Sequence, residues 1–266
     1  RRPVGVAETP ERGAARTIEQ FHIAFLEVAS SQLPLGEYVV KDGVNIRFFF
    51  GSGRRSKDVD FDYVGDRFEG FGNRVAATLR SEALRRLLAT REIEVGNVRD
   101  DKQTNTTRRW RFKLSRPGVA DASSKLEFSN RPSSGGFALE PIDAELARRL
   151  QGRAPRLNHY LAPAAIAQKI SALVRRAETQ PRDVFDLDHL FVEAPRAMAE
   201  ADVRPDEVEA AIARAFELTY DEYVSTVVDY LDEDFVQRLG TRDAWEDMVL
   251  RVTGSLRSWL ETHGGE

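Results

Sequence analysis

The sequence predicts an α+β protein in which a mixed sheet with flanking helices is followed by an all-α C-terminal domain. Two observations support this prediction. Alternating apolar positions typical of strands lie among helical segments in residues 15–152, whereas residues 153–266 show only helical spacing. The 266 residues are enough for two ordinary domains. Residues 1–14 are rich in proline, glycine and charge, and are expected to form a loose arm.

The N-terminal part opens with a helix at Thr17, because apolar residues recur there every three or four positions until LPLG ends the pattern. The sequence EYVV predicts a short buried strand. DGVNIRFFF predicts a turn into a short helix that Gly51 ends, and DVDFDYV predicts an alternating strand. Residues 73–90 are expected to form one amphipathic helix.

The remaining elements follow from the same two periodicities. Further strands are expected at residues 91–98, 107–115 and 124–129. The polar sequence RDDKQTNT between the first two predicts a hairpin with a mobile tip. Helices of the C-terminal domain are expected at residues 163–178, 182–193, about 205–230 and 243–262.

Composition excludes several classes of protein. The chain has no cysteine, which excludes disulfides, thiolate nucleophiles and Cys-ligated zinc. Its four histidines are scattered and form no H-E-x-x-H pair, and the Walker A and G-x-S-x-G motifs are missing. No apolar run approaches the roughly 18 residues of a membrane helix. Since no signal peptide is found either, we expect a cytoplasmic protein without a membrane partner.

Charge is distributed unevenly along the chain. Residues 195–266 carry 17 acidic and 7 basic side chains, a net charge of −10, whereas the whole chain has a formal charge of −4. Residues 1–194 therefore carry +6. A basic part indicates a polyanionic ligand, although solvated helix faces would give the same asymmetry. The acidic part, with DYLDEDF at residues 229–235, could present a surface to a basic partner.

The sequence GSGRRSKDVDFD places three acids at alternate positions of a predicted strand. Asp58, Asp60 and Asp62 therefore share one face, and the apolar residues between them face the core. Neighbouring carboxylates lie about 6.6 Å apart, which costs roughly 2.5 kcal/mol per pair at an effective dielectric constant of about 20. Either this face is an edge exposed to water, or a cation neutralises it. GSGRRS supplies amides and hydroxyls that can cradle phosphates, and paired carboxylates beside phosphates are typical Mg²⁺ ligands.

Five residues of this region carry a resemblance to a known superfamily. Gly51, Ser52, Ser56, Asp58 and Asp60 are similar to the G-S-x(n)-[ST]-x-D-x-D signature of the DNA polymerase β-like nucleotidyltransferases. Downstream, AIAQKISALVRR and RDVFDLDHL resemble two further motifs of the AbiEii/AbiGii toxin family, which includes the mycobacterial MenT toxins. The resemblance runs from about residue 38 to residue 190. It implies a polymerase β-like nucleotidyltransferase sheet in the N-terminal domain.

The resemblance also implies roles for single residues. In that family, paired aspartates hold catalytic Mg²⁺, and a serine-containing turn and a helix lysine contact the triphosphate of an NTP. These roles fall on Asp58 and Asp60 for the metal, and on Gly51, Ser52, Ser56 and Lys169 for the nucleotide, with Lys169 also catalytic. An aspartate of the last motif completes the catalytic site. Asp186 is the first choice and Asp183 its competitor, because both lie on one face of the predicted helix.

Two points qualify this assignment. Lys169 borders an apolar face, so its stem could simply pack along the seam between the domains. Family members commonly carry Gly-Gly-Thr in the turn that enters the short helix, whereas this chain has Asp42-Gly43-Val44. The missing hydroxyl and the added acid predict altered nucleotide choice or weaker activity.

Glu127, Arg109 and Arg111 are additional site candidates. Polymerase-like sites often add a third carboxylate from a nearby strand, and Glu127 suits that role or that of an exposed strand residue. Arg109 and Arg111 share one strand face with Lys113, and this row could follow an RNA backbone or be solvated. The aromatic residues between them are expected in the core.

The predicted function is Mg²⁺-dependent transfer of a nucleoside monophosphate from an NTP to an acceptor hydroxyl. By resemblance, the acceptor is the 3′ end of a tRNA, and the protein is the toxin of a toxin–antitoxin pair with a cognate antitoxin protein as partner. One alternative keeps the chemistry but transfers the nucleotide to a protein hydroxyl, as in AMPylation. The other is a module that binds a nucleotide or a partner without turnover.

Overall fold

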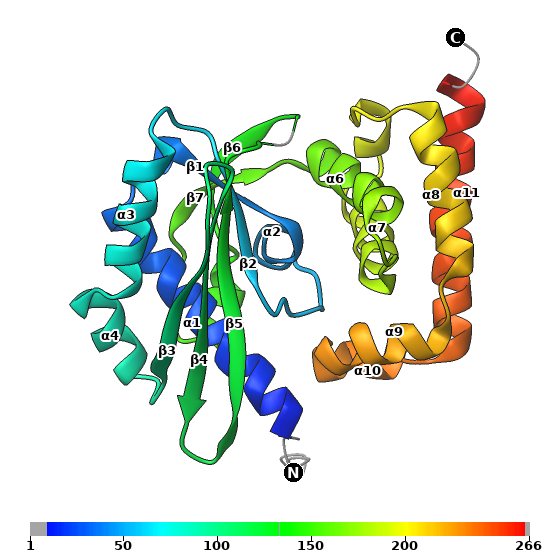
Figure 1. Ribbon diagram of the computed structural model, residues 1–266. Helices are drawn as coiled ribbons and strands as arrows, with labels where there is room; N and C mark the ends of the chain where they lie inside the picture. The colour runs from blue at the N-terminus through cyan, green and yellow to red at the C-terminus, as the bar shows by residue number, and fades with distance from the viewer. Residues whose placement is uncertain (1–9, 133, 264–266) are drawn as a thin grey trace.

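The computed structural model describes residues 10–132 and 134–263, and it confirms the predicted fold class (Figure 1). A mixed sheet with flanking helices is followed by a region of helices. The first part contains α1 (Pro10–Gln32), β1 (Tyr38–Lys41), α2 (Asp42–Phe49), β2 (Val59–Tyr63), α3 (Phe68–Leu79), α4 (Glu82–Ala89), β3 (Glu94–Gln103), β4 (Thr107–Arg116), β5 (Val119–Ser129), β6 (Phe137–Pro141), α5 (Ala144–Arg149) and β7 (Arg156–Tyr160).

The seven strands lie in the order β3-β4-β5-β2-β1-β7-β6. β2 is antiparallel to β1 and parallel to β5, while β1 is parallel to β7. The register places Asp60 of β2 beside Glu127 of β5 on one side and beside Lys41 of β1 on the other. Charged residues from three neighbouring strands are therefore brought together in the middle of the sheet.

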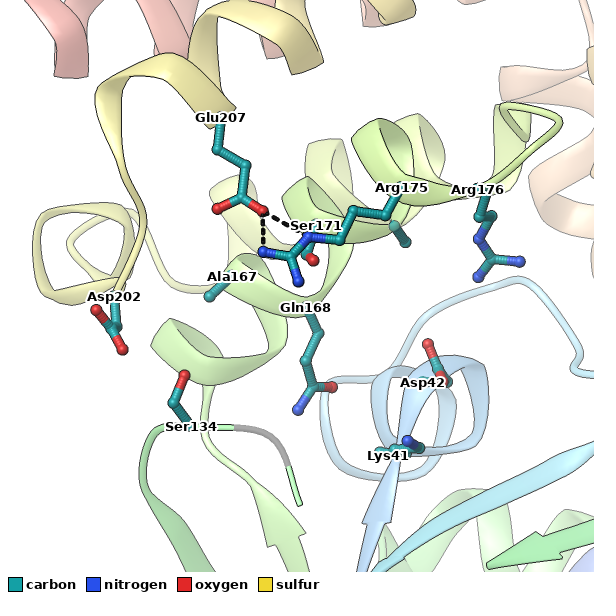
Figure 2. Close-up of a pocket in the computed structure, with 11 residues that line it drawn as sticks. Lys41, Asp42, Ser134, Ala167, Gln168, Ser171, Arg175, Arg176, Asp202 and Glu207 are labelled. Atoms are coloured by element: carbon teal, nitrogen blue, oxygen red, sulfur yellow. Dashed lines mark hydrogen bonds and ion pairs between the residues drawn. The ribbon is translucent and has the colours of Figure 1, made fainter. Parts of the chain in front are cut away.

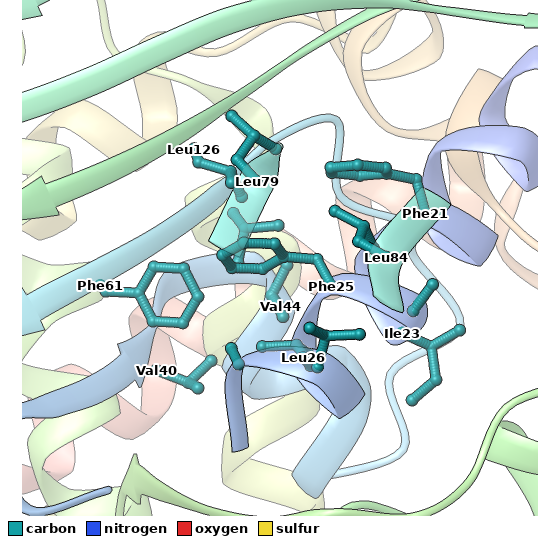
Figure 3. Close-up of a cluster of buried hydrophobic side chains, with 14 of the residues drawn as sticks. Phe21, Ile23, Phe25, Leu26, Val40, Val44, Phe61, Leu79, Leu84 and Leu126 are labelled. Carbon is teal, nitrogen blue, oxygen red and sulfur yellow. The ribbon is translucent and has the colours of Figure 1, made fainter. Parts of the chain in front are cut away.

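The core of the first part lies where α1, α3 and α4 cover the sheet (Figure 1). Every residue from 17 to 26 of α1 is buried. Figure 3 shows Phe21 and Phe25 of α1 among Val40, Phe61 and Leu126 of the central strands. Burial of Phe61 confirms the predicted alternation of β2, because a strand with one apolar face must turn its acids the other way.

The helical region packs around a second core. Its helices are α6 (Ala162–Arg175), α7 (Pro181–Glu193), α8 (Pro205–Glu217), α9 (Tyr220–Thr226), α10 (Glu233–Leu239) and α11 (Arg242–His263), and short 3₁₀ turns occur at Leu35–Glu37, Ala197–Glu200 and Val228–Tyr230. α2 lies between the sheet and the α6–α7 pair (Figure 1). Its Val44 and Phe48 belong to the first core and its Ile46 to the second, so α2 joins the two parts.

Two predicted helices are each interrupted. The helix expected at residues 73–90 is divided into α3 and α4, because the Ser81 hydroxyl caps α4 by accepting a hydrogen bond from the Leu84 N–H. The helix expected at about 205–230 ends with α8, and α9 starts at a capping box formed by Thr219 and Glu222. In both cases a Ser or Thr cap begins a new helix inside a continuous apolar pattern.

The sheet also extends beyond the predicted elements. β6 and β7 were not expected, and β7 pairs with β1 although the prediction assigned it to the C-terminal domain. α5 and α10 are likewise unpredicted short helices. The hairpin of β3 and β4 is confirmed, but most of RDDKQTNT continues β3 as far as Gln103. Division of the chain into two domains stays a prediction.

At the N-terminus, α1 begins at Pro10, so residues 10–14 are helical and the prediction of a loose arm is wrong for them. The rest of that arm lies outside the described residues. Among the described helices, none combines the length and the apolar character that crossing a membrane requires.

Candidate active site

A charged cavity of about 320 Å³ lies between the acidic face of β2 and α6. The lining includes six of the predicted site residues: Ser56, Asp58, Asp60, Arg109, Glu127 and Lys169. Eight basic side chains outnumber four acidic ones in this lining. The basic residues are Lys41, Arg54, Lys57, Arg109, Lys125, Lys169, Arg176 and Arg182, and the acidic residues are Asp42, Asp58, Asp60 and Glu127. This surplus of positive charge favours a polyanionic ligand.

A second cavity of about 470 Å³, the adjoining cavity, shares Lys41, Asp42 and Arg176 with the charged cavity. Figure 2 shows its wall on α6, where Gln168 points toward the side on which Lys41 and Asp42 lie. The shared residues make the two cavities neighbours along one groove. A ligand with a charged end and an uncharged body could therefore extend from one into the other.

The three acids at and directly before β2 divide into two groups. Asp58 and Asp60 line the charged cavity together with Glu127, and we name these three the carboxylate cluster. Asp62 is fully buried and binds Lys41 at 2.7 Å and the Tyr160 hydroxyl at 2.8 Å. Asp62 therefore ties β2 to β1 and β7 and does not line the cavity.

The Lys125 ammonium lies within the carboxylate cluster. Its Nζ is 2.9 Å from Asp60, 3.5 Å from Glu127 and 3.7 Å from Asp58. Burial disfavours the charged ammonium, but the three carboxylates outweigh burial and raise the pKa of Lys125. For Asp60, burial is the main effect, and it raises the pKa of this carboxyl despite Lys125. The three carboxylates together favour a positive charge at the position of the Lys125 ammonium.

The carboxylate pair of Asp58 and Asp60 fits a magnesium site. Within the described ranges, no group of three or more His, Cys, Asp or Glu side chains is arranged to hold a metal by itself. Mg²⁺, however, usually takes one or two carboxylates and completes its shell with water and substrate phosphate. Two carboxylates on one strand face, beside a cavity rich in basic groups, meet that requirement.

Lys169 is held by three carboxylates. Its side chain is 3% exposed, and its Nζ lies 3.0 Å from Asp186, 3.2 Å from Asp42 and 3.3 Å from Asp183. Burial works against the charge, but Asp186, Asp42 and Asp183 outweigh it and raise the pKa of Lys169. The ammonium is therefore charged at neutral pH, and it joins Asp42 of α2 to Asp183 and Asp186 of α7.

Both aspartates of the last motif contact Lys169, each with a different second partner. Asp186 accepts two hydrogen bonds from Arg54, at 3.1 and 2.9 Å, whereas Asp183 pairs with Arg176 at 3.1 Å. Neither aspartate is exposed, and neither lines the charged cavity. Their geometry therefore suits positioning of Arg54, Arg176 and Lys169, which do line it.

The Gly-Ser turn, residues 51–56, differs from its predicted arrangement. Gly51 has a φ of +70°, which glycine adopts readily. The Ser52 hydroxyl is buried and accepts a hydrogen bond from the Arg54 N–H at 3.2 Å. Gly51 and Ser52 are not part of the cavity lining, whereas Arg54 and Ser56 are. Ser56 donates to the carbonyl oxygen of Asp58 at 2.8 Å and so fixes the start of β2.

The acidic segment at residues 229–235 supports the Gly-Ser turn from the other side. The Arg55 N–H donates to the Tyr230 carbonyl, and the Asp232 N–H donates to that of Gly53. The Asp232 carboxylate pairs with Arg55 and Arg47, each at 2.8 Å. Part of the acidic sequence that suggested a surface for a basic partner is therefore used inside the molecule.

The arginine row of β4 is only partly free for a ligand. Arg109 lines the charged cavity but binds Glu127 at 2.6 Å, and Arg111 binds Asp101 at 2.8 Å. Arg111 and Lys113 line a third cavity of about 430 Å³, which borders the charged cavity. The aromatic residues between them are buried, as predicted.

Six basic lining residues were not identified as site residues from the sequence: Lys41, Arg54, Lys57, Lys125, Arg176 and Arg182. Lys125 precedes Glu127 by two positions, so strand alternation could have placed both on one face. Arg54 is part of GSGRRS, but its partner Asp186 lies 132 residues away in the chain. No local pattern indicates such a pair.

Comparison with known proteins gives the same result as the motifs. Residues 30–261 match the family described as nucleotidyl transferase AbiEii toxin, type IV TA system. Among solved structures, one described as a nucleotidyltransferase from H. pylori has a TM-score of 0.58 and 17% identity, covering 93% of this chain and 95% of that one.

Two further solved structures are similar. JHP933 from Helicobacter pylori has a TM-score of 0.56 and 16% identity, covering 93% of this chain and 92% of that one. MenT4, a nucleotidyltransferase toxin from Mycobacterium tuberculosis H37Rv, has a TM-score of 0.56 and 17% identity, covering 93% of this chain and 88% of that one. At such identities the likeness shows a shared fold. No curated protein sequence gives a significant match.

Proposed function

Because the chain belongs to the AbiEii family of nucleotidyltransferase toxins of type IV toxin–antitoxin systems, we propose that the charged cavity is a Mg²⁺-dependent active site. The reaction moves a nucleoside monophosphate from an NTP to an acceptor hydroxyl at the 3′ end of a tRNA. The hydroxyl oxygen loses its proton and forms a bond to the α-phosphorus. The bond from this phosphorus to the bridging oxygen breaks, and pyrophosphate leaves.

One arrangement carries the proposal: a carboxylate pair suited to Mg²⁺ and a set of basic groups suited to phosphate line the same cavity. Asp60 lies on β2 and Asp58 directly precedes that strand, while the buried ammonium of Lys169 comes from α6. Phosphoryl transfer depends mainly on positioning and on charge stabilisation. This cavity provides both kinds of group on a rigid sheet and a buried helix.

The roles of the residues follow from their surroundings. Asp58 and Asp60 would hold Mg²⁺, which when bound stabilises charge on the attacking and departing oxygens. Lys169 and Arg54 would offset negative charge on the phosphates. Asp186 and Asp183 keep these cations in place. Ser56 positions the backbone of Asp58 through its 2.8 Å hydrogen bond.

An RNA acceptor is supported by the basic surface beside the carboxylate cluster. The cavity of about 430 Å³ shares Lys57, Asp58 and Lys125 with the charged cavity, and Arg99 and Lys113 belong to its lining. An RNA backbone crossing these groups would bring a terminal hydroxyl toward Asp58, with an affinity that falls as salt rises. A protein hydroxyl remains the alternative acceptor.

Incubation with NTPs labelled at the α-phosphate tests the proposal. The purified protein is mixed with Mg²⁺, total tRNA and total protein of the host, once with each of the four NTPs. Label in tRNA supports the proposed reaction, whereas label in protein supports the AMPylation-like alternative. Nucleotide binding without label in either fraction would instead indicate the binding module.

Substitution of the metal-binding pair gives the first prediction. Asp58→Asn and Asp60→Asn should each lower the transfer rate on the order of 100-fold or more, because charge stabilisation at the reacting phosphate is lost. The measurement is label transfer at saturating NTP, with circular dichroism confirming the fold. Asp121→Asn, an exposed strand acid outside the cavity, is the matched control and should retain full activity.

The family also implies a cognate antitoxin. We propose that a cognate antitoxin protein is the physiological partner, and that the protein acts in the cytoplasm, where NTPs and tRNA are found. Co-expression of the neighbouring gene with this chain tests the first point: relief of growth inhibition is the expected result.

A further inference from the structure

Asp42 occupies a backbone position that favours glycine. It lies where β1 ends and α2 begins, and its φ is +56°, in the left-handed region. Gly43 is required for another reason: a Cβ there would approach the Arg54 guanidinium to 2.8 Å and the Ser56 hydroxyl to 3.0 Å. A glycine at position 42 would adopt this φ without strain, so the aspartate is present there despite a cost in stability.

The Asp42 carboxylate differs from the two other partners of Lys169. Asp183 and Asp186 are fully buried and bind second cations, whereas the Asp42 side chain is 32% exposed. Asp42 also lines both the charged cavity and the adjoining cavity, and Figure 2 shows it near Lys41 in the lining of the adjoining cavity. Of the three carboxylates that contact Lys169 in the described part of the chain, Asp42 is therefore the one that a ligand entering the cavities would meet.

The position suits a group that imitates a phosphate. A carboxylate oxygen 3.2 Å from the Lys169 ammonium makes the contact that a phosphate oxygen of an NTP would make. Burial favours the neutral acid, but Lys169 and Lys41 outweigh it and lower the pKa of Asp42, so the carboxylate is charged at neutral pH. An incoming triphosphate must displace Asp42 from Lys169 or accept repulsion from it.

We propose that Asp42 is a built-in competitor of the nucleotide phosphates for Lys169, and that it keeps the affinity for NTP low. The inference rests on the proposed function of the charged cavity. The consequence is regulatory. An enzyme with weakened affinity for NTP is not saturated with it, so its rate changes with the cellular NTP concentration. A toxin of this design would be most active when nucleotides are abundant.

Calorimetric titration of the purified full chain with ATP and, separately, with inorganic triphosphate tests the proposal, in both cases with Mg²⁺. Asp42→Asn keeps the size of the side chain and removes its charge. We expect it to bind both ligands about tenfold more tightly than the wild type, as one nearby charge in a partly solvated site would dictate. Inorganic triphosphate has no base or ribose, so an equal gain identifies the phosphates as the competing group.

Two control variants separate charge from backbone strain. Asp121→Asn removes an exposed acid of β5 that lines neither cavity, and should leave both affinities unchanged. Glu92→Gly relieves an equal φ of +56° far from the site, and should raise Tm without changing affinity. Asp42→Gly should combine both effects, with a higher Tm and tighter binding.

The outcomes decide the inference separately from the proposed function. If the wild type binds ATP and Asp42→Asn binds it no better, Asp42 is not a competitor, and the proposed active site stands. If neither protein binds ATP or inorganic triphosphate, both ideas fail. If ATP and inorganic triphosphate bind tightly only to the Asp42→Asn variant, both the proposed active site and the competition by Asp42 are supported.

Discussion

At the scale of single residues, the candidate site consists of buried charges that fix one another. Asp186 is 1% exposed and holds Arg54 through two hydrogen bonds and Lys169 through a third contact. Removing one member of a buried ionic group leaves the others unpaired in a poorly solvating environment, which costs more than the pairing contributes. The same residues that position the phosphate-binding cations therefore also matter for stability.

Asp186→Asn should show this in the pH dependence of unfolding. Burial favours the neutral acid, but Arg54 and Lys169 outweigh it and hold the pKa of Asp186 below its usual value. The carboxylate therefore contributes stability above the unfolded pKa of about 3.9, and this contribution is lost as pH falls through the folded pKa. We expect Asp186→Asn to be about 3 kcal/mol less stable at neutral pH, with a shallower loss of stability in acid.

Urea unfolding between neutral and acidic pH measures both effects. Asp188→Asn is the matched control, since Asp188 lies on the same helix and also binds an arginine through two hydrogen bonds, to the half-exposed Arg251. Exposed pairs contribute about 1 kcal/mol or less, so this variant should stay close to the wild type. Equal destabilisation of the two variants would contradict the role assigned to burial.

At the scale of elements, β5 brings a cation into the carboxylate cluster. Lys125 and Glu127 lie two positions apart on one face of β5, and the register with β2 sets Glu127 beside Asp60. The Lys125 ammonium contributes positive charge next to the carboxylates that would bind a divalent cation. Metal binding near Asp60 must therefore compete with Lys125.

Lys125→Met should accordingly bind a divalent cation more tightly. Mn²⁺ is the probe, and its free fraction can be followed by electron paramagnetic resonance without any turnover. We expect the dissociation constant to fall by about tenfold, because one competing charge is removed from a partly buried site. Lys113→Met, at an exposed position of the neighbouring strand β4, is the control and should leave the Mn²⁺ dissociation constant unchanged. Weaker Mn²⁺ binding by Lys125→Met would mean that Lys125 assists the metal.

At the scale of the whole molecule, the site lies where the two cores meet. Arg54 and Asp42 come from the first part, Lys169 and Asp186 from the helical region, and the acidic segment at residues 229–235 returns to cover the Gly-Ser turn. A Cβ on Gly53 would collide with the ring of Phe235 at 2.4 Å, so the two segments are in close contact.

Asp232→Ala tests the contact between the parts. The substitution removes the carboxylate that pairs with Arg47 and Arg55, both largely buried, and should cost about 2 kcal/mol of unfolding free energy. Thermal and urea unfolding measure it. Asp234→Ala in the same segment is exposed and should change stability by about 0.5 kcal/mol or less. If the two variants are equally stable, Asp232 does not join the two parts, and the interpretation of the acidic segment as a surface for a basic partner is favoured instead.

The sequence by itself determined the elements whose signal is local. Alternation in DVDFD fixed which face of β2 carries Asp58 and Asp60, because a strand with an apolar core face has no other stable orientation. The motifs identified the family and singled out Lys169 as a candidate site residue. Helix ends at Ser81 and Thr219 were missed, because a cap inside a continuous apolar pattern is a weaker signal than the pattern.

Only the tertiary structure decided how the charges combine. It showed that Asp183 and Asp186 both hold Lys169, that Lys125 lies among the carboxylates, and that Asp42 contacts Lys169 from 127 residues away. These pairings join residues far apart in the chain, and they depend on sheet register and on how α6 and α7 pack against α2. Periodicity can assign a residue to a face, but which charge lies opposite it is set by packing.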